Sequence, residues 1–219
     1  MCRLLLVENP DGMDPLPHLD HFKTLSKNSR EYQGHGWGCA WLDDKDQWRF
    51  HHHIRPIWED HSKFPPSRLF VAHARSAFRN EGIAVENNMP FYDGEAVFLF
   101  NGELRGVRIK ADGRIGAEKV FNTIKRFDRG DLAQAVSRGV GMLRKRTRHI
   151  RALNFILANK AQVHYCCHFT EDPGYFQLHA SRSRNTRIIC SQPYPLSGSH
   201  WQPVANRKTG VFDLKQASE

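Results

Sequence analysis

The sequence places a cysteine directly after the initiator methionine, and this residue, Cys2, is the first candidate for chemistry. Removal of Met1 would leave a thiol and a free α-amino group on the same residue. That amine has an ordinary pKa of about 7.7–8.0, so it can serve as the base for its own thiol. A nucleophile and a base on one N-terminal residue form a known catalytic arrangement, although a Met-Cys start also occurs by chance.

Two later stretches carry the other groups that amide hydrolysis by a terminal cysteine requires. Asn101-Gly102 follows the apolar run 96–100. An asparagine side chain and the N–H of the next glycine, placed at a strand end, can donate two hydrogen bonds to an oxyanion. Arg75 ends the strand-like run 69–75, where a guanidinium can bind a substrate carboxylate through two hydrogen bonds. Each group also has an ordinary interpretation, because Asn-Gly is a common turn and a strand-end arginine is usually a surface charge.

The composition is that of an ordinary globular chain with a basic excess. The 219 residues are 40% hydrophobic and 25% charged, and we expect residues 1–219 to form one domain. The formal net charge of +9 permits an anionic partner, but no nucleic-acid motif accompanies the basic residues, so we favour a solvated helix face. Five cysteines without a CxxC pair are typical of reduced, buried thiols. No apolar run nears the roughly 20 residues of a membrane helix, so we expect a cytoplasmic protein without membrane association.

Two clusters contain residue types that bind metals. Residues 51–53 are three consecutive histidines, and residues 166–168 read Cys-Cys-His. Both clusters lie in strand-like stretches, where adjacent side chains point to opposite faces and cannot converge on one ion. We therefore expect no metal site and no cofactor.

The hydrophobic pattern predicts strands, then two helices, then strands again. Residues 9–30 are expected to be a loop, because three prolines interrupt any regular element. One helix carries an apolar stripe within 120–127, and the second begins at Asp131, a good N-cap. Strands with apolar residues on both faces indicate two sheets with helices outside them. The expected strands are 2–7, 39–42, 48–54, 69–75, 96–100, 152–158, 162–168, 175–180 and 187–190, with one or two short edge strands after residue 201.

Several of these stretches occur together, and in this order, in one known family. They are residues 1–5 (MCRLL), 36–38 (GWG), 40–41 (AW), 72–75 (AHAR), 86–91 (ENNMPF) and 101–104 (NGEL), with weaker matches at 118–121 (EKVF) and 188–193 (IICSQP). The sequence resembles the class II glutamine amidotransferases, which are N-terminal nucleophile hydrolases, and in particular their short stand-alone members. The resemblance covers most of the chain.

This resemblance implies an α+β fold, a four-layer αββα sandwich of the N-terminal nucleophile hydrolase type. It implies that Cys2, after removal of Met1, attacks the γ-carboxamide of glutamine or of a related small γ-glutamyl compound. A γ-glutamyl thioester would form and be hydrolysed, with ammonia or an amine as the leaving group. Arg75 would bind the substrate carboxylate, and Asn101 and Gly102 would form the oxyanion hole. Because the resemblance extends nearly to the C-terminus, we expect any ammonia acceptor to be a separate subunit, unless hydrolysis is itself the reaction.

One departure from the family pattern concerns the α-ammonium group of the substrate. The family's T-D-S-E motif aligns with residues 115–118, so Gly116 stands where the family has the aspartate that holds this ammonium. Loss of such a counter-ion costs on the order of 1–4 kcal/mol of binding free energy. The sequence therefore leaves three functions open: a glutamine-type amidohydrolase, a hydrolase of another γ-glutamyl conjugate, and a catalytically silent binding subunit.

Overall fold

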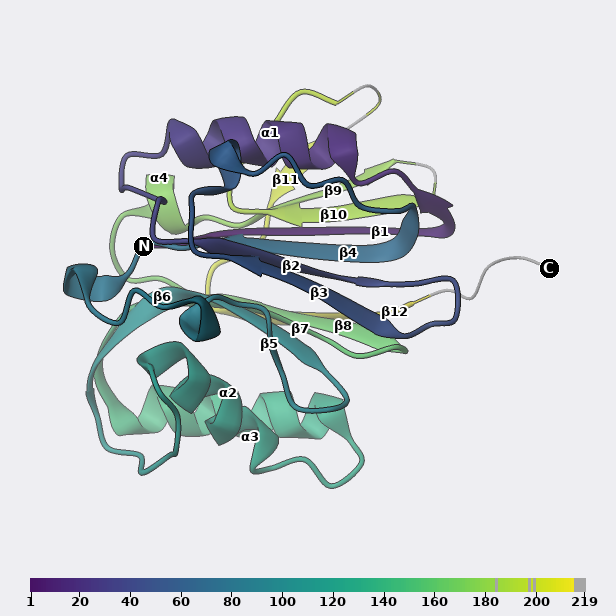
Figure 1. Ribbon diagram of the computed structural model, residues 1–219. Helices are drawn as coiled ribbons and strands as arrows, with labels where there is room; N and C mark the ends of the chain where they lie inside the picture. The colour runs from purple at the N-terminus through teal and green to yellow at the C-terminus, as the bar shows by residue number, and fades with distance from the viewer. Residues whose placement is uncertain (184, 197, 199, 215–219) are drawn as a thin grey trace.

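Two antiparallel β-sheets lie face to face at the centre of the protein, and helices cover their outer faces (Figure 1). The computed structural model describes residues 1–183, 185–196, 198 and 200–214. Helix α1 lies outside the first sheet, and helices α2 and α3 lie outside the second. The order of layers is therefore αββα, which confirms the fold class predicted from the sequence. No helix in the described part of the chain is long and apolar enough to cross a membrane.

Within the described residues the first sheet has seven strands and the second has five. In spatial order the first sheet contains β11 (Trp201–Pro203), β9 (His179–Ser183), β10 (Thr186–Cys190), β1 (Arg3–Met13), β4 (Ser67–Ala74), β2 (Trp37–Leu42) and β3 (Trp48–His53). The second contains β12 (Lys208–Asp213), β8 (Gln162–Cys167), β7 (Thr147–Ala158), β6 (Val97–Val107) and β5 (Phe91–Tyr92). The helices are α1 (Leu16–Lys27), α2 (Gly116–Lys125), α3 (Leu132–Arg146) and the short α4 (Pro173–Phe176), with single 3₁₀ turns at Ile57–Glu59, Phe78–Asn80 and Val85–Asn87.

Strand β1 shows why the sheets are apolar on both faces. Leu4 and Leu6 pack between the two sheets, whereas Leu5 and Val7 pack under α1, and all four side chains are fully buried. A strand that is covered on both sides has to bury every side chain, so its sequence reads as a continuous apolar run rather than an alternating one. The same rule explains the apolar run at the start of β6.

Helix α1 corrects the prediction of a loop over residues 9–30. Pro15 is the N-cap of α1, and Pro17 lies within its first turn, where a missing N–H leaves no helical hydrogen bond unmade. These prolines therefore begin the helix instead of breaking it. Leu19 and Phe22 then lie on the face that packs under the first sheet.

Two further boundaries differ from the prediction. Residues 175–176 belong to helix α4, and the strand that was expected there begins only at His179. Strand β6 does not end before Asn101 but continues to Val107, because β7 pairs with it over the whole length. Asn101 and Gly102 are thus held inside a strand, opposite residues of β7, and not in a turn.

Gly139 marks the place where α3 packs against α2. A Cβ atom on Gly139 would lie 2.8 Å from the Cα of Ile124 in α2, which is closer than carbon atoms approach one another. Gly141 lies on the same helix, and a Cβ atom there would have no neighbour within 4 Å. Alanine substitutions at the two glycines therefore distinguish the effect of helix packing on stability from the effect of helix propensity.

We expect Gly139→Ala to lower the free energy of unfolding by about 1–3 kcal/mol, because the two helices must move apart to admit the methyl group. Gly141→Ala should raise it by up to about 1 kcal/mol, because alanine favours the helical backbone more than glycine does. Urea unfolding followed by circular dichroism measures both. Equal changes in the two variants would contradict the close helix contact.

Candidate active site at one end of the two sheets

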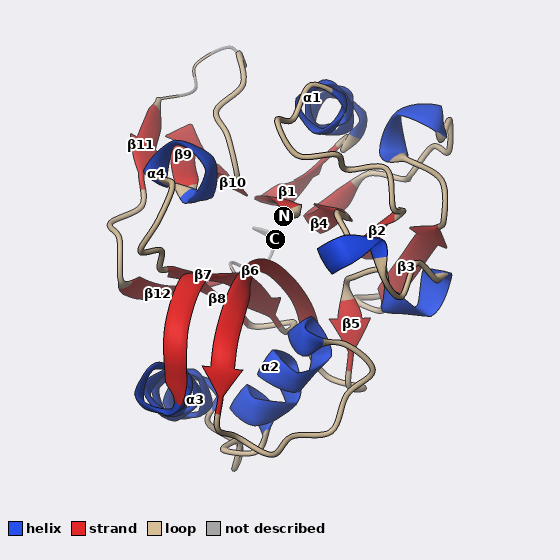
Figure 2. Ribbon diagram, turned by 90° about the vertical axis from the view of Figure 1, so that its left-hand side faces the viewer, coloured by secondary structure: helices blue, strands red, loops and turns tan. Residues whose placement is uncertain are grey.

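The pairing of β1 with β4 brings Cys2 next to Arg75. Arg3 lies opposite Ala74, so the residues just before β1 lie beside those just after β4. The Cys2 sulfur is 3.6 Å from the carbonyl oxygen of Ser76 and can donate a weak hydrogen bond to it. Figure 2 looks onto this end of the molecule and shows the N-terminus above β6 and β7.

Cys2 lines a cavity of about 750 Å³ between β1, β4, β6 and the start of α2. Three of the four residues predicted to form the site, Cys2, Arg75 and Gly102, line this one cavity. Asn101, the fourth, does not line it, although its neighbours on both sides in β6 do. These residues lie just before β1, just after β4 and within β6, which are far apart in the sequence, so the fold has brought them together.

Arg75 is held by its backbone while part of its guanidinium stays free. Its N–H donates to the carbonyl of Gly36 at 2.9 Å, and its Nη2 donates to the carbonyl of Gly82 at 2.8 Å. The residue is only 4% exposed, and its Nη1 has no hydrogen-bond partner among the described residues. Burial lowers the pKa of this guanidinium, and the nearby Cys2 thiolate would raise it. Burial of a cation with an unused hydrogen-bond donor lowers the stability of the folded protein. An anion bound in the cavity would pair this donor and recover that free energy.

Asn101 and Gly102 lie where β6 passes the cavity. Asn101 is 1% exposed, and neither its amide nitrogen nor its amide oxygen has a partner among the described residues. It follows Leu99 by two positions, so its side chain is on the face that looks toward the first sheet. A Cβ atom on Gly102 would lie 2.2 Å from the carbonyl oxygen of Ala152, so only glycine fits there. Asn101 therefore supplies unused hydrogen-bonding groups, next to a position that only glycine can occupy.

The Cys2 thiol is protonated at neutral pH and requires a base. Burial raises its pKa above the ordinary value, although the positive N-terminus, a backbone hydrogen bond at Ser76 and the charge of Arg75 act in the opposite direction. His73 on β4 is a poor base, because burial and the charge of Arg75 lower its pKa to about 3. Its Nε2 lies 3.2 Å from the carbonyl of Phe100, to which the neutral ring can donate.

Three residues that the sequence analysis did not single out hold the start of the chain. The α-ammonium of Met1 forms an ion pair with Glu31. The Met1 carbonyl accepts hydrogen bonds from Nε2 of Gln33, at 2.7 Å, and from the hydroxyl of Tyr175. No spacing or motif marks these residues, because they are separated from Met1 by 30 to 174 positions. While Met1 is attached, the nitrogen of Cys2 is an amide and cannot act as a base.

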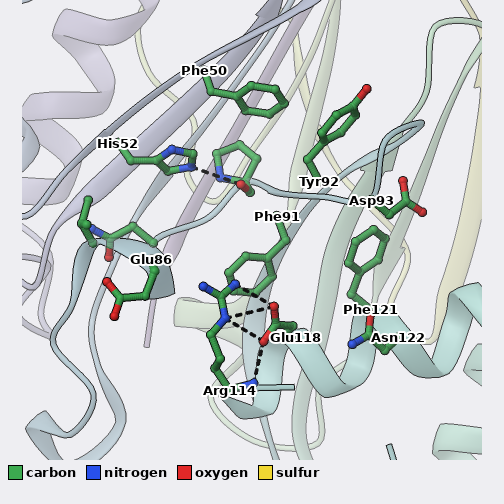
Figure 3. A pocket seen from close by; sticks show the side chains of 13 residues that line it. Phe50, His52, Glu86, Phe91, Tyr92, Asp93, Arg114, Glu118, Phe121 and Asn122 are labelled. Carbon is green, nitrogen blue, oxygen red and sulfur yellow. Dashed lines mark hydrogen bonds and ion pairs between the residues drawn. The ribbon is translucent and has the colours of Figure 1, made fainter. Parts of the chain in front are cut away.

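A second cavity, of about 540 Å³, lies next to the first (Figure 3). Aromatic side chains line it, among them Phe50, Phe91 and Tyr92. Arg114 lines both cavities and donates from Nη2 to Glu118 at 2.6 Å, so this pair is part of the wall between them. None of the residues predicted to form the site lies in the second cavity.

The histidine cluster 51–53 makes separate contacts. His51 Nε2 lies 2.7 Å from a carboxylate oxygen of Asp60, whereas His52 Nε2 lies 3.1 Å from the carbonyl of Pro90 in the second cavity. Within the described residues no three histidine, cysteine, aspartate or glutamate side chains gather in a way that could hold a metal ion.

Neither a protein-family model nor a curated protein sequence matches the chain. Solved structures do match its fold. A glutamine phosphoribosylpyrophosphate amidotransferase from B. subtilis is 16% identical, with a TM-score of 0.69 over 99% of this chain and 49% of its own. A glutamine aminotransferase class-II domain protein from Silicibacter pomeroyi is 16% identical, with a TM-score of 0.58 over 98% of this chain and all of its own. A predicted glutamine amidotransferase from Pseudomonas aeruginosa is 12% identical, with a TM-score of 0.61 over 97% of each chain.

These structures confirm the fold that the sequence resemblance implied. The chain spans about half the length of the B. subtilis enzyme and nearly the whole length of the other two proteins. At 12–16% identity the likeness establishes a shared architecture. The assignment of a reaction rests on the cavity itself.

The exposure and pKa of Cys2 predict how it reacts with iodoacetamide. We expect one fast adduct on the folded protein, and Cys2→Ser should abolish it, because Cys39, Cys166, Cys167 and Cys190 are fully buried. In chains that retain Met1, the rate should keep rising above about pH 8.5, since the raised pKa leaves little thiolate below that value. Intact mass against time and pH measures both. A rate that levels off below pH 8 would contradict the assigned environment.

Proposed function

We propose that the protein is an amidohydrolase of the glutamine amidotransferase type, in which Cys2 becomes the nucleophile after removal of Met1. The observation that carries this proposal is the meeting of Cys2, Arg75 and Gly102 in one cavity. The fold that brings them together is shared with proteins named as glutamine amidotransferases. The substrate is an ω-carboxamide that also bears a carboxylate, such as glutamine or a related γ-glutamyl compound.

The proposed first step forms a thioester. The free α-amine of Cys2 takes the thiol proton, and the sulfur attacks the carbon of the substrate amide. The oxyanion that develops accepts hydrogen bonds from the N–H of Gly102 and from the side chain of Asn101. Collapse of this intermediate breaks the C–N bond, and the ammonium of Cys2 returns its proton to the departing ammonia or amine.

The second step is hydrolysis of the thioester. Water gives a proton to the Cys2 amine and attacks the same carbon, with the oxyanion again held at Gly102 and Asn101. The product is a carboxylate, and the sulfur leaves as a thiolate that regains the proton. An α-amine with a pKa near 8 suits both proton transfers at neutral pH far better than His73, whose pKa is about 3.

Arg75 fixes the substrate with its free Nη1. The substrate carboxylate takes up this unused donor and places the amide group at a set distance from it. Orientation of this kind lowers the activation free energy, because the reacting atoms no longer have to find one another. The same contact pairs a buried cation that has no anionic partner among the described residues.

The side chains at Cys2 and Asn101 are expected to affect turnover differently. Cys2→Ala should abolish release of ammonia from amide substrates. Asn101→Ala should lower kcat by about 10²–10³ with little change in KM, because an oxyanion donor acts mainly in the transition state. The exposed Asn28→Ala is the matched control and should leave kcat unchanged.

Steady-state ammonia release, with each variant's fold checked by circular dichroism, measures these effects. Unchanged turnover in Cys2→Ala would rule out Cys2 as the nucleophile. Loss of affinity without loss of kcat in Asn101→Ala would show that Asn101 binds the ground state and does not serve the oxyanion.

A further inference from the structure

The start of helix α2 forms the part of the cavity wall that determines which group may stand beside the substrate carboxylate. We propose that the preferred substrate is an ω-carboxamide with a carboxylate but no ammonium group on the adjoining carbon, as in glutaramate or an N-acylated glutamine. This inference rests on the proposed function of the same cavity and specifies the substrate class.

The first observation is that the start of α2 lies beside Arg75. Nη2 of Arg75 and Cγ2 of Ile115 are each 3.9 Å from the point that a Cβ atom on Gly82 would occupy. Ile115 is the N-cap residue of α2, and it lines the cavity together with Gly116. In glutamine the ammonium and the carboxylate share one carbon. A carboxylate bound by Arg75 would therefore bring the ammonium toward this helix end.

The second observation is that the start of α2 offers no free anion to this cavity, because Glu118, the acidic residue of its first turn, is paired with Arg114 and lines only the second cavity. The N-cap, Ile115, provides no side-chain cap, and Gly116, the first residue of α2, has no side chain at all. The first N–H groups of a helix lack helical partners and carry a partial positive charge. An ammonium placed here would meet this charge, whereas a neutral amide oxygen or a hydrocarbon group would not be repelled.

The third observation concerns the charged side chains of the cavity. Arg105, Arg114 and Lys119 line it in addition to Arg75. Of the carboxylates that line it, Glu103 is already paired with Arg105 at 2.6 Å and with Arg151 at 3.4 Å.

Glu81 is the other carboxylate on the cavity wall, and it is an exposed residue in the loop that follows β4. Among the described residues the buried part of the site therefore offers no free anion to an ammonium group. Glu81 is the competing candidate for that role, and it is tested separately below.

The cavity also has apolar space near the start of α2. The apolar residues that line the cavity include Ile109, Ile115, Ala117, Val120 and Leu143. A volume of about 750 Å³ falls within the range of pockets that bind ligands of drug size. This room suits an acyl group on the α-nitrogen, and acylation also removes the charge of that nitrogen.

The first test compares three substrates on the Met1-free protein: glutamine, N-acetylglutamine and glutaramate. We expect kcat/KM for ammonia release to be at least tenfold higher for glutaramate or N-acetylglutamine than for glutamine. Preference for N-acetylglutamine alone would narrow the class to acylated substrates. Equal or better use of glutamine would overturn this inference and leave the proposed function intact, whereas no release from any amide would overturn both.

The second test introduces an anion at the helix end. A Cβ atom on Gly116 would have no neighbour within 4 Å, and the backbone there has no positive φ, so Gly116 tolerates a side chain such as that of aspartate. We expect the ratio of kcat/KM for glutamine to that for glutaramate to rise at least tenfold in this variant, and to stay unchanged in Gly116→Ala. The ratio is measured within one preparation, so it does not depend on the folded fraction. An unchanged ratio in Gly116→Asp would contradict the inference.

The Glu81→Gln variant tests the alternative that Glu81 binds the ammonium group of the substrate. We expect this variant to keep the wild-type ratio between the two substrates, because Glu81 does not bind an ammonium in this account. A fall in the glutamine to glutaramate ratio would show that Glu81 serves as the counter-ion, and the proposed substrate class would then be wrong.

Discussion

The antiparallel pairing of β1 with β4 is the constraint on which the site depends. β1 is an inner strand of the first sheet, bonded to β10 on one side and to β4 on the other, and its side chains are buried on both faces. A shift of one residue in this register would turn Leu4 and Leu6 away from the core between the sheets. The burial of these leucines therefore fixes the position of Cys2 relative to Arg75, and a terminal residue that would otherwise fray becomes a rigid part of a cavity.

The site contains buried polar groups without hydrogen-bond partners, as do several other places in the described interior, among them Trp41, Trp48 and Thr147. Nη1 of Arg75 and both amide atoms of Asn101 are buried and make no hydrogen bond among the described residues. Buried polar groups are nearly always paired in folded proteins, because each unpaired one costs about 1–3 kcal/mol. Both lie at the same end of the two sheets, one on β6 and one just after β4. A ligand with an anionic group and a developing oxyanion would pair these atoms. Their unpaired state among the described residues is therefore consistent with a binding site.

Sequence reasoning recovered the features that short-range patterns determine. The continuous apolar runs at residues 4–7 and 96–100 predict strands covered on both faces, and the order of motifs leads to the correct fold. Sequence patterns do not predict the extent of a strand when pairing with a segment distant in the sequence determines it. Strand β6 continues through Asn101 because β7 pairs with it, and the polar sequence after residue 100 gives no sign of that.

The contacts that hold Met1 also join residues that are distant in the sequence, so no local pattern predicts them. Glu31 and Gln33 follow the predicted loop 9–30, and Tyr175 begins a predicted strand, and no local spacing connects any of the three to the N-terminus. Helix α1 was missed for another reason. Proline breaks the interior of a helix but is well suited to its start, which is where Pro15 and Pro17 lie.

The central claim is that the nucleophile and its base are both on Cys2 once Met1 has gone. The most direct measurement is amide hydrolysis by preparations that contain different fractions of Met1-free chain, with each fraction determined by intact mass. Activity should rise in proportion to the Met1-free fraction and extrapolate to zero when every chain retains Met1. Full activity in chains that retain Met1 would contradict the central claim, because their Cys2 nitrogen is an amide and cannot take the proton.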